Sequence, residues 1–245
     1  MVSPGSGEPN GAFPTTHWSV VLAAGHARSS AAEAALAEFC RAYWYPLYAY
    51  ARRSVRTPAD AQDLTQGFFG HLLQSQILAR AEARKGRFRS YLLGCFQNYI
   101  ASDHARSTAQ KRGGECPAFS LDAQEAEARF GRELVDRHSP ETLYEKSWAL
   151  AVIDQVFGLL EAEVRLSGRA PLFEALCPFL QGDSAATSYV AVARNLGTSE
   201  GTIKVTVHRL RRRYRDLLRA VVAPTVDGPT EVEEELRHLM RVLQP

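Results

Sequence analysis

Residues 189–209 read YVAVARNLGTSEGTIKVTVHR, and the spacing of their small and apolar side chains predicts two helices joined by a tight turn. This is the helix-turn-helix pattern. Ala193 is small where the second helix has to cross, and Ile203 is placed to fill the space between the helices. Gly197 can adopt the positive φ that the turn requires, and Ser199 can cap the second helix.

The second helix of this pair is strongly cationic, with seven Lys or Arg against two acids between positions 200 and 219. Such a helix fits the major groove of DNA, where early side chains reach base edges and later arginines meet phosphates. A helical pair with a glycine turn also occurs in proteins that bind nothing, but the charge of this helix favours DNA. The candidate DNA contacts are Ser199, Thr202, Lys204, Thr206, His208, Arg209, Arg211, Arg212 and Arg213.

Charge is distributed by segment although the total is near neutral, with 29 Lys+Arg against 27 Asp+Glu. Residues 80–112 carry eight bases and two acids, and residues 115–163 carry eleven acids and four bases. Two cationic blocks separated by an acidic stretch predict two contact points for a polyanion. The alternative is that each charge run is a solvated helix face.

Apolar residues recur at three- and four-residue steps through most of the chain, and no alternating strand pattern persists. The sequence therefore predicts an all-α protein with two helical domains joined by an acidic linker. The predicted parts are a disordered N-terminus (1–12), an N-terminal extension helix (13–29), a first helical domain (30–112), the linker (113–139), the domain with the helix-turn-helix (140–222) and a C-terminal extension helix (223–245). Pro46 is expected to kink or reset the first long helix.

Several function classes are disfavoured by what the sequence contains. No apolar run approaches the ~20 residues of a membrane span, and the start MVSPGSGEPNG is unlike a signal peptide. The four cysteines form no CxxC pair, which suits reduced thiols in the cytoplasm. Since no histidine pair has metal-ligand spacing and no GxSxG or phosphate loop is present, we expect no catalytic residue, no metal and no cofactor.

Three segments taken together resemble a known family. They read FCRAYWYPLYAYARRSVRTPADAQDLTQGFFGHLL (39–73), FRSYLLGCFQNYIASDHAR (88–106) and GTIKVTVHRLRRRYRDLL (201–218). In order and spacing they are similar to the sigma-70-like factors of the extracytoplasmic-function (ECF) group, which keep only regions 2 and 4 of the larger sigma factors. The resemblance covers about residues 30–112 and 140–220. It implies a cytoplasmic subunit that binds core RNA polymerase and promoter DNA, reading the −35 duplex and melting the −10 element.

The resemblance also implies roles for individual residues. Asp63 and Gln66 occupy the motif that presents polar groups to the polymerase clamp. Because Gly67 stands where that motif has a glutamate, Asp60 and Asp63 are expected to carry more of the contact. For Asp60 the alternative is a helix cap after Thr57.

The segment from Arg84 to Arg89 matches the pocket for a base flipped from the melted −10 strand, where stacking and charge offset the lost base pairing. The −10 candidates are Arg84, Lys85, Arg87, Phe88, Arg89, Tyr91 and Asn98. Tyr91 is equally well explained as a core aromatic, and Asn98 as a side chain that stabilises the bundle. Thr206 replaces an arginine common in relatives, so a different −35 preference is expected.

The C-terminal extension has an apolar stripe and an acidic surface. Thr230 and Glu233 form a capping-box pattern, and the residues from 224 to 245 carry five acids and two bases. The stripe consists of Val232, Leu236, Leu239, Met240 and Leu243. Our hypothesis is a regulatory or docking helix that packs on the protein or on a partner and shields a basic surface. Deletion of 224–245 is then expected to change promoter output without unfolding the chain.

Two other interpretations remain at the level of sequence. The chain can be a helix-turn-helix regulator that acts without joining polymerase, with residues 1–165 as a sensor or dimerisation domain. If it is a sigma factor, an anti-sigma factor or a regulatory kinase is a further candidate partner. An enzyme is the least favoured class, for the reasons given above.

Overall fold

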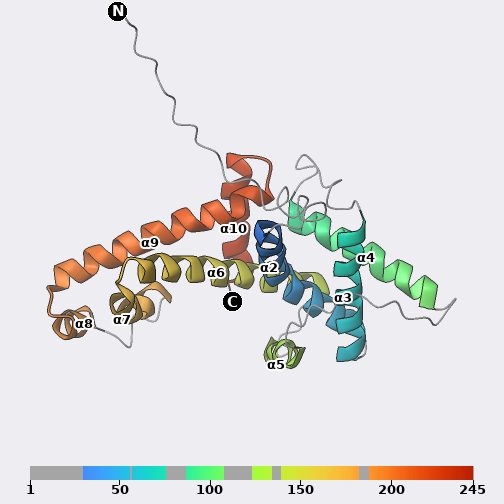
Figure 1. Cartoon of the computed structure of the whole chain (residues 1–245), viewed down its shortest axis with the longest axis horizontal. Coiled ribbons are helices and arrows are strands. Elements are labelled where there is room, and N and C mark those ends of the chain that lie inside the picture. Colours follow the sequence, from blue (N-terminus) through green and yellow to red (C-terminus); the bar gives the residue numbers. More distant parts are fainter. Residues whose placement is uncertain are drawn as a thin grey trace, which may run out of the picture.

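The structure is a computed structural model that describes residues 30–55, 57–75, 87–107, 123–133, 139–181 and 188–244. All regular structure in these ranges is helical, so the all-α prediction is confirmed (Figure 1). The helices are α2 (Ser30–Ser54), α3 (Pro58–Gln74), α4 (Phe88–Ser107), α5 (Ala123–Glu133), α6 (Pro140–Leu166), α7 (Ala170–Gln181), α8 (Tyr189–Asn195), α9 (Glu200–Val222) and α10 (Pro229–Val242), with one 3-10 turn at Ala223–Thr225. The predicted N-terminal segments 1–12 and 13–29 lie outside the described residues. No helix in these ranges combines the length and apolar character needed to cross a bilayer.

Helix α2 is the central helix of the molecule. Every side chain from Tyr43 to Ala51 is buried, so this part of α2 is covered on all sides, as a helix with apolar residues all round requires. Pro46 lies inside α2, which runs from Ser30 to Ser54 as one helix, so the expected reset at Pro46 does not occur. Burial on every side holds the helix together where a proline removes one backbone hydrogen bond.

The core is continuous across both predicted domains. Phe39 and Tyr43 of α2 belong to the same cluster of buried side chains as Trp148 of α6, Val222 of α9 and Leu239 of α10. Helix α6, which belongs to the second predicted domain, packs directly on α2. The predicted boundary at 113–139 therefore does not coincide with a break in the core.

Part of the predicted linker is helix α5, which packs against α2. The Tyr48 hydroxyl donates a hydrogen bond of 2.6 Å to Glu127, and the Arg52 guanidinium lies 3.1 Å from the same carboxylate. Burial raises the pKa of Glu127, but the hydrogen bonds from Arg52 and Tyr48 outweigh it, so the net pKa is lowered. Phe130 is buried beneath the Arg52 guanidinium, 5.2 Å from Cζ to the ring centroid. A few apolar residues among many acids are thus enough to dock this helix.

Helices α3 and α4 approach closely at Gly67. A Cβ atom at this position would lie 2.5 Å from the Tyr99 hydroxyl, closer than real Cβ contacts. The Tyr99 side chain of α4 thus fills the space that a side chain at position 67 would need.

We expect Gly67→Ala to lower the free energy of unfolding by about 1–3 kcal/mol because it overpacks this contact. In a Tyr99→Phe background the next ring atom is 3.5 Å away, an ordinary contact. There the same substitution should cost little, since alanine favours a helix by about 1 kcal/mol over glycine. Urea denaturation of the four variants measures the coupling. Gly94→Ala on α4, with no described atom within 4 Å of its Cβ, is the control. Equal effects in both backgrounds would contradict the steric account.

Candidate nucleic-acid interface

The pair of helices α8 and α9 has the local geometry that the sequence predicts. Gly197 has a φ of +62° at the turn between them, a value that favours glycine. The Ser199 hydroxyl accepts a hydrogen bond of 3.1 Å from the Thr202 amide and so caps α9. Ala193 and Ile203 are buried against α7 in a second, smaller core. These predictions from the sequence are confirmed.

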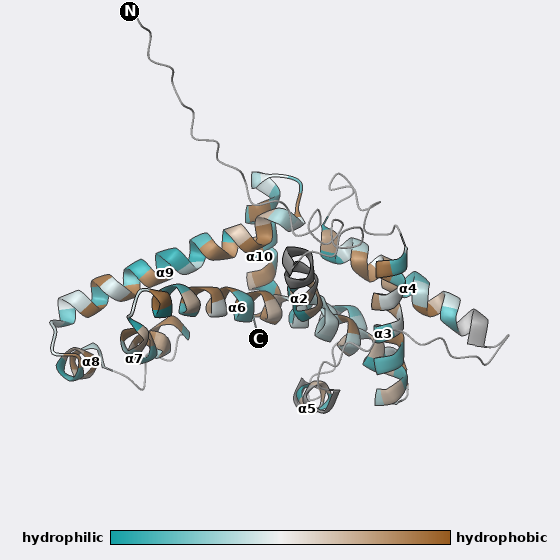
Figure 2. Cartoon of the chain, in the orientation of Figure 1, coloured by the Kyte–Doolittle hydropathy of each residue, from teal (hydrophilic) through white to brown (hydrophobic). Residues whose placement is uncertain are grey.

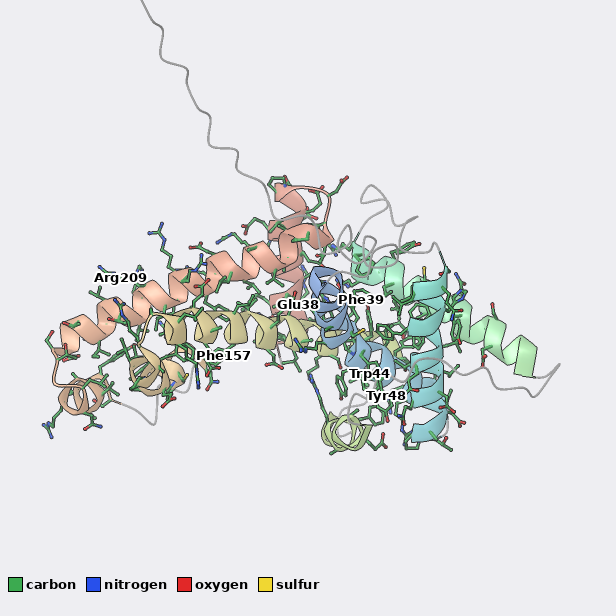
Figure 3. The ribbon with its side chains drawn as sticks, in the orientation of Figure 1. Glu38, Phe39, Trp44, Tyr48, Phe157 and Arg209 are labelled. Carbon is green, nitrogen blue, oxygen red and sulfur yellow. The ribbon has the colours of Figure 1, made fainter. Side chains whose placement is uncertain are left out.

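Helix α9 presents a cationic face away from the rest of the protein. Its apolar side chains face α6, α7 and α8, and polar residues cover the opposite side (Figure 2). Arg209 points away from α6 into solvent (Figure 3). Arg212 lies almost one turn further on the same outward face and is also exposed. Neither arginine has an acid partner within the described part of the chain. His208 is exposed on the same helix.

Lys204 contacts residues of both α8 and α9 but is still exposed. It is 58% exposed, and its Nζ lies 2.7 Å from a carboxylate oxygen of Glu200 one turn earlier. The hydrogen bond and the charge of Glu200 raise the pKa of Lys204, so the amine stays protonated. Nζ also lies 5.8 Å from the centroid of the Tyr189 ring on α8. The cation is therefore positioned at the start of α9, where base edges would be read.

Two of the other predicted residues of α9 contact neighbouring helices, and two more make hydrogen bonds within their own helix or its cap. The Arg211 guanidinium donates a 2.7 Å hydrogen bond to the Phe179 carbonyl, and Arg213 pairs with Glu163 of α6 at 2.5 Å. The Thr206 hydroxyl donates to the Thr202 carbonyl on its own helix. Thr202 is exposed, and its hydroxyl lies 2.8 Å from Ser199 Oγ. Of the four predicted arginines of α9, Arg209 and Arg212 are therefore the two without a partner in the described part of the chain.

Val205 of α9 is a further candidate DNA contact that was not predicted from the sequence. It is 51% exposed beside the outward face of α9. An apolar side chain in the major groove can contact the methyl group of thymine. Its position on the helical repeat, one turn before Arg209, was the available signal.

The second predicted cluster, around the start of α4, is arranged differently. Arg84 and Lys85 lie outside the described residues. Phe88 is buried, with its ring 5.2 Å from that of Tyr43. Arg89 is only 3% exposed, so in this arrangement neither side chain can reach DNA.

The remaining −10 candidates are more accessible. Arg87 is partly exposed and pairs with Glu235 of α10 at 2.8 Å. Tyr91 is half-buried with its ring 6.4 Å from that of Phe88, which fits the core alternative, whereas Asn98 is exposed. The structure therefore divides the predicted −10 set into buried and accessible members.

The candidate polymerase contacts lie along α3. The Asp60 carboxylate accepts a 2.7 Å hydrogen bond from the Thr57 hydroxyl, and the backbone amide of Asp60 donates a hydrogen bond to the Thr57 hydroxyl oxygen. Asp60 is therefore part of a helix cap. Asp63 is exposed and Gln66 is half-buried. Residues three apart lie near one another on a helix surface, so Asp63 lies next to both Asp60 and Gln66.

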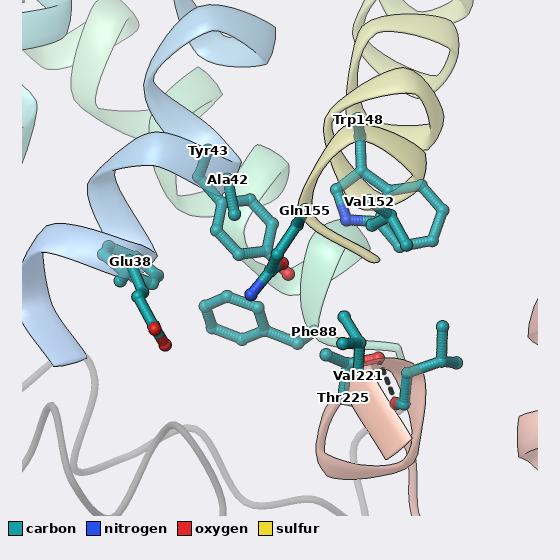
Figure 4. A pocket seen from close by; sticks show the side chains of 11 residues that line it. Glu38, Ala42, Tyr43, Phe88, Trp148, Val152, Gln155, Val221 and Thr225 are labelled. Atoms are coloured by element: carbon teal, nitrogen blue, oxygen red, sulfur yellow. Dashed lines mark hydrogen bonds between the residues drawn. The ribbon is translucent and has the colours of Figure 1, made fainter. Parts of the chain in front are cut away.

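A small cavity lies where α2, α4, α6 and the end of α9 meet (Figure 4). Its volume is about 50 Å³, and aromatic side chains of Tyr43, Phe88 and Trp148 form much of its wall. That volume holds one or two water molecules. Within the described ranges no three His, Cys, Asp or Glu side chains gather closely enough to hold a metal ion.

Comparison of the chain with protein-family models, with curated proteins and with solved structures returns no match.

Proposed function

We propose that this protein is a sigma factor of the ECF type, which binds core RNA polymerase and directs it to promoters in the cytoplasm. Helix α9 reads the −35 duplex, and the segment around the start of α4 melts and reads the −10 element. The observation that carries the proposal is the outward face of α9, where Arg209 and Arg212 are exposed on the second helix of a glycine-turn pair. A helix so placed fits the major groove with cations available for bases and phosphates.

The polymerase part of the proposal rests on the sequence resemblance together with the surface of α3. Asp63 is exposed one turn after the capped start of that helix, with Gln66 one turn further. Polar groups of this kind can form hydrogen bonds and charge pairs with basic side chains of a partner. An ordinary helix-turn-helix regulator needs no such surface, so polymerase binding separates the two functions.

The test is reconstitution with core RNA polymerase from the host bacterium. The full-length chain should co-elute with core polymerase and direct initiation at discrete promoters, mapped by sequencing transcripts from genomic DNA. Asp63→Ala with Gln66→Ala should weaken polymerase binding by about 1–2 kcal/mol, the size expected for interface residues that contribute to the binding energy. Binding of duplex DNA by α9 should not change.

Asp154→Ala serves as the control, because Asp154 is an exposed acid on α6 far along the chain from α3. It should leave polymerase binding unaltered. If the chain binds duplex DNA but never associates with core polymerase, the sigma-factor proposal is wrong and the regulator is favoured.

A further inference from the structure

Helix α10 packs on the protein itself. Val232 and Leu239 are buried in the main core, and the helix contacts both α6 and α9. Figure 1 shows α10 near the centre of the molecule, beside the end of α9 and close to α2. Deletion of 224–245 would therefore expose the core, and point substitutions are the better probe of this helix.

An ion pair between α10 and α4 is almost completely buried. Glu235 is 1% exposed, and its carboxylate accepts a 2.5 Å hydrogen bond from Arg89 Nε. The Arg89 guanidinium also pairs with Glu145 of α6 and lies over the Trp148 ring, 5.1 Å from Cζ to the centroid. His238 of α10 lies 2.8 Å from the same Glu145. Two helices thus surround one arginine of the predicted −10 segment.

The acids of α10 reach bases of both cationic blocks. Arg87 lies 2.8 Å from Glu235 and 3.6 Å from Glu234. At the other block, Arg219 near the end of α9 pairs with Glu233 at 2.7 Å. Three consecutive glutamates of one short helix therefore neutralise arginines that are far apart in sequence.

We propose that α10 is an autoinhibitory clasp whose glutamates occupy Arg87 and Arg89 and keep them from DNA. This inference rests on the proposed function for the role of those arginines. A guanidinium held by a carboxylate in a bidentate pair offers the same donors that a phosphate would take. DNA and Glu235 thus compete for the same groups, and α10 must move before both arginines can be used.

The chemistry of the pair makes such a release feasible. A buried ion pair gains little over its separated, hydrated partners, because desolvation of both charges offsets their attraction. Apolar side chains in the same place would find no phosphate to replace the contact that they lose when α10 moves. Exchange of a carboxylate for a phosphate keeps the arginine paired in both states.

The test compares two substitutions that remove the same charge from the same helix. Glu235→Gln removes the buried partner of Arg89, and Glu231→Gln removes an exposed acid without an ion pair in the described structure. Each full-length variant is titrated with a fluorescein-labelled single-stranded oligonucleotide of mixed sequence. Hydrogen exchange of residues 229–242 is followed with and without the oligonucleotide.

If α10 is a clasp, E235Q should bind the oligonucleotide about threefold to tenfold more tightly than E231Q, because a larger fraction of the chain is open. The amides of α10 should exchange faster in E235Q, and faster in the wild-type chain once the oligonucleotide is bound. Equal affinities of E235Q and E231Q, or unchanged protection of α10 in the bound wild-type chain, would overturn the clasp.

A second variant covers the case in which E235Q does not fold. Glu234→Gln removes only the exposed, more distant partner of Arg87, and should tighten binding by about twofold relative to E231Q. Equal binding would again overturn the proposal. The oligonucleotide assay contains no polymerase, so it decides the clasp independently of polymerase binding. A chain that fails to bind polymerase would contradict the proposed function only.

Discussion

Replacement of Arg89 by alanine is expected to lower the free energy of unfolding by up to about 3–5 kcal/mol, the cost of breaking a buried ion pair by removing one partner. The carboxylate left behind is that of Glu235, which is 1% exposed and keeps only the partly exposed Arg87 as a partner. The substitution also removes the cation over Trp148 and the pairing with Glu145. Urea denaturation followed by circular dichroism gives the free energy of unfolding of each variant.

Arg41→Ala is the matched control, because Arg41 is exposed on α2 and has no acid partner in the described structure. It should change stability by less than about 0.5 kcal/mol, as surface substitutions usually do. A loss below about 1 kcal/mol for R89A would show that hydration or Arg87 alone compensates Glu235, and would contradict a buried pair that depends on Arg89.

The double variant Arg89→Met with Glu235→Leu separates the cost of a lone charge from the value of the pair. Apolar residues of similar volume often replace a buried ion pair without loss of stability. We therefore expect the double variant to recover most of the stability that R89A loses. Such recovery would mean that the ion pair adds no net stability. The pair could then be exchanged for contacts with DNA at little cost, as the clasp requires.

Local features of the sequence predicted the α8–α9 pair well. The turn at Gly197, the cap at Ser199 and the burial of Ile203 all depend on residues within about one helical turn of each other. Periodicity and capping report such contacts directly. The same holds for Thr57 and Asp60 at the start of α3, where the cap interpretation agrees with the hydrogen bonds.

Contacts between distant parts of the chain were not predictable in this way. Arg89 and Glu235 are separated by 146 positions, and no spacing rule relates them. The sequence resemblance placed Arg89 in a segment that contacts DNA, whereas its burial depends on a partner that local sequence does not reveal. Helix α5 was missed for a related reason, since its docking depends on Tyr48 and Arg52 of α2, about 75 positions away along the chain. The shared core of the two predicted halves follows from the same kind of contact.

The double substitution Arg209→Ala with Arg212→Ala should weaken binding of a −35 duplex by about 1–3 kcal/mol for each arginine that reads a base. Both side chains are exposed on the outward face of α9, so their removal leaves the core intact. The measurement is a fluorescence titration of the full-length chain with a duplex selected from a random-sequence pool, repeated at several salt concentrations.

The salt dependence distinguishes the two ways in which these arginines can contact DNA. If they meet only phosphates, the loss should be the same for all sequences, and the slope of log affinity against log salt should fall by about one for each arginine. If Arg209 reads a base, the loss should be largest on the selected duplex. Arg169→Ala with Arg241→Ala removes the same charge from exposed positions off α9 and should have a much smaller effect. Equal losses for the two double variants would mean that α9 contributes only general charge, and its role as the reading helix would be wrong.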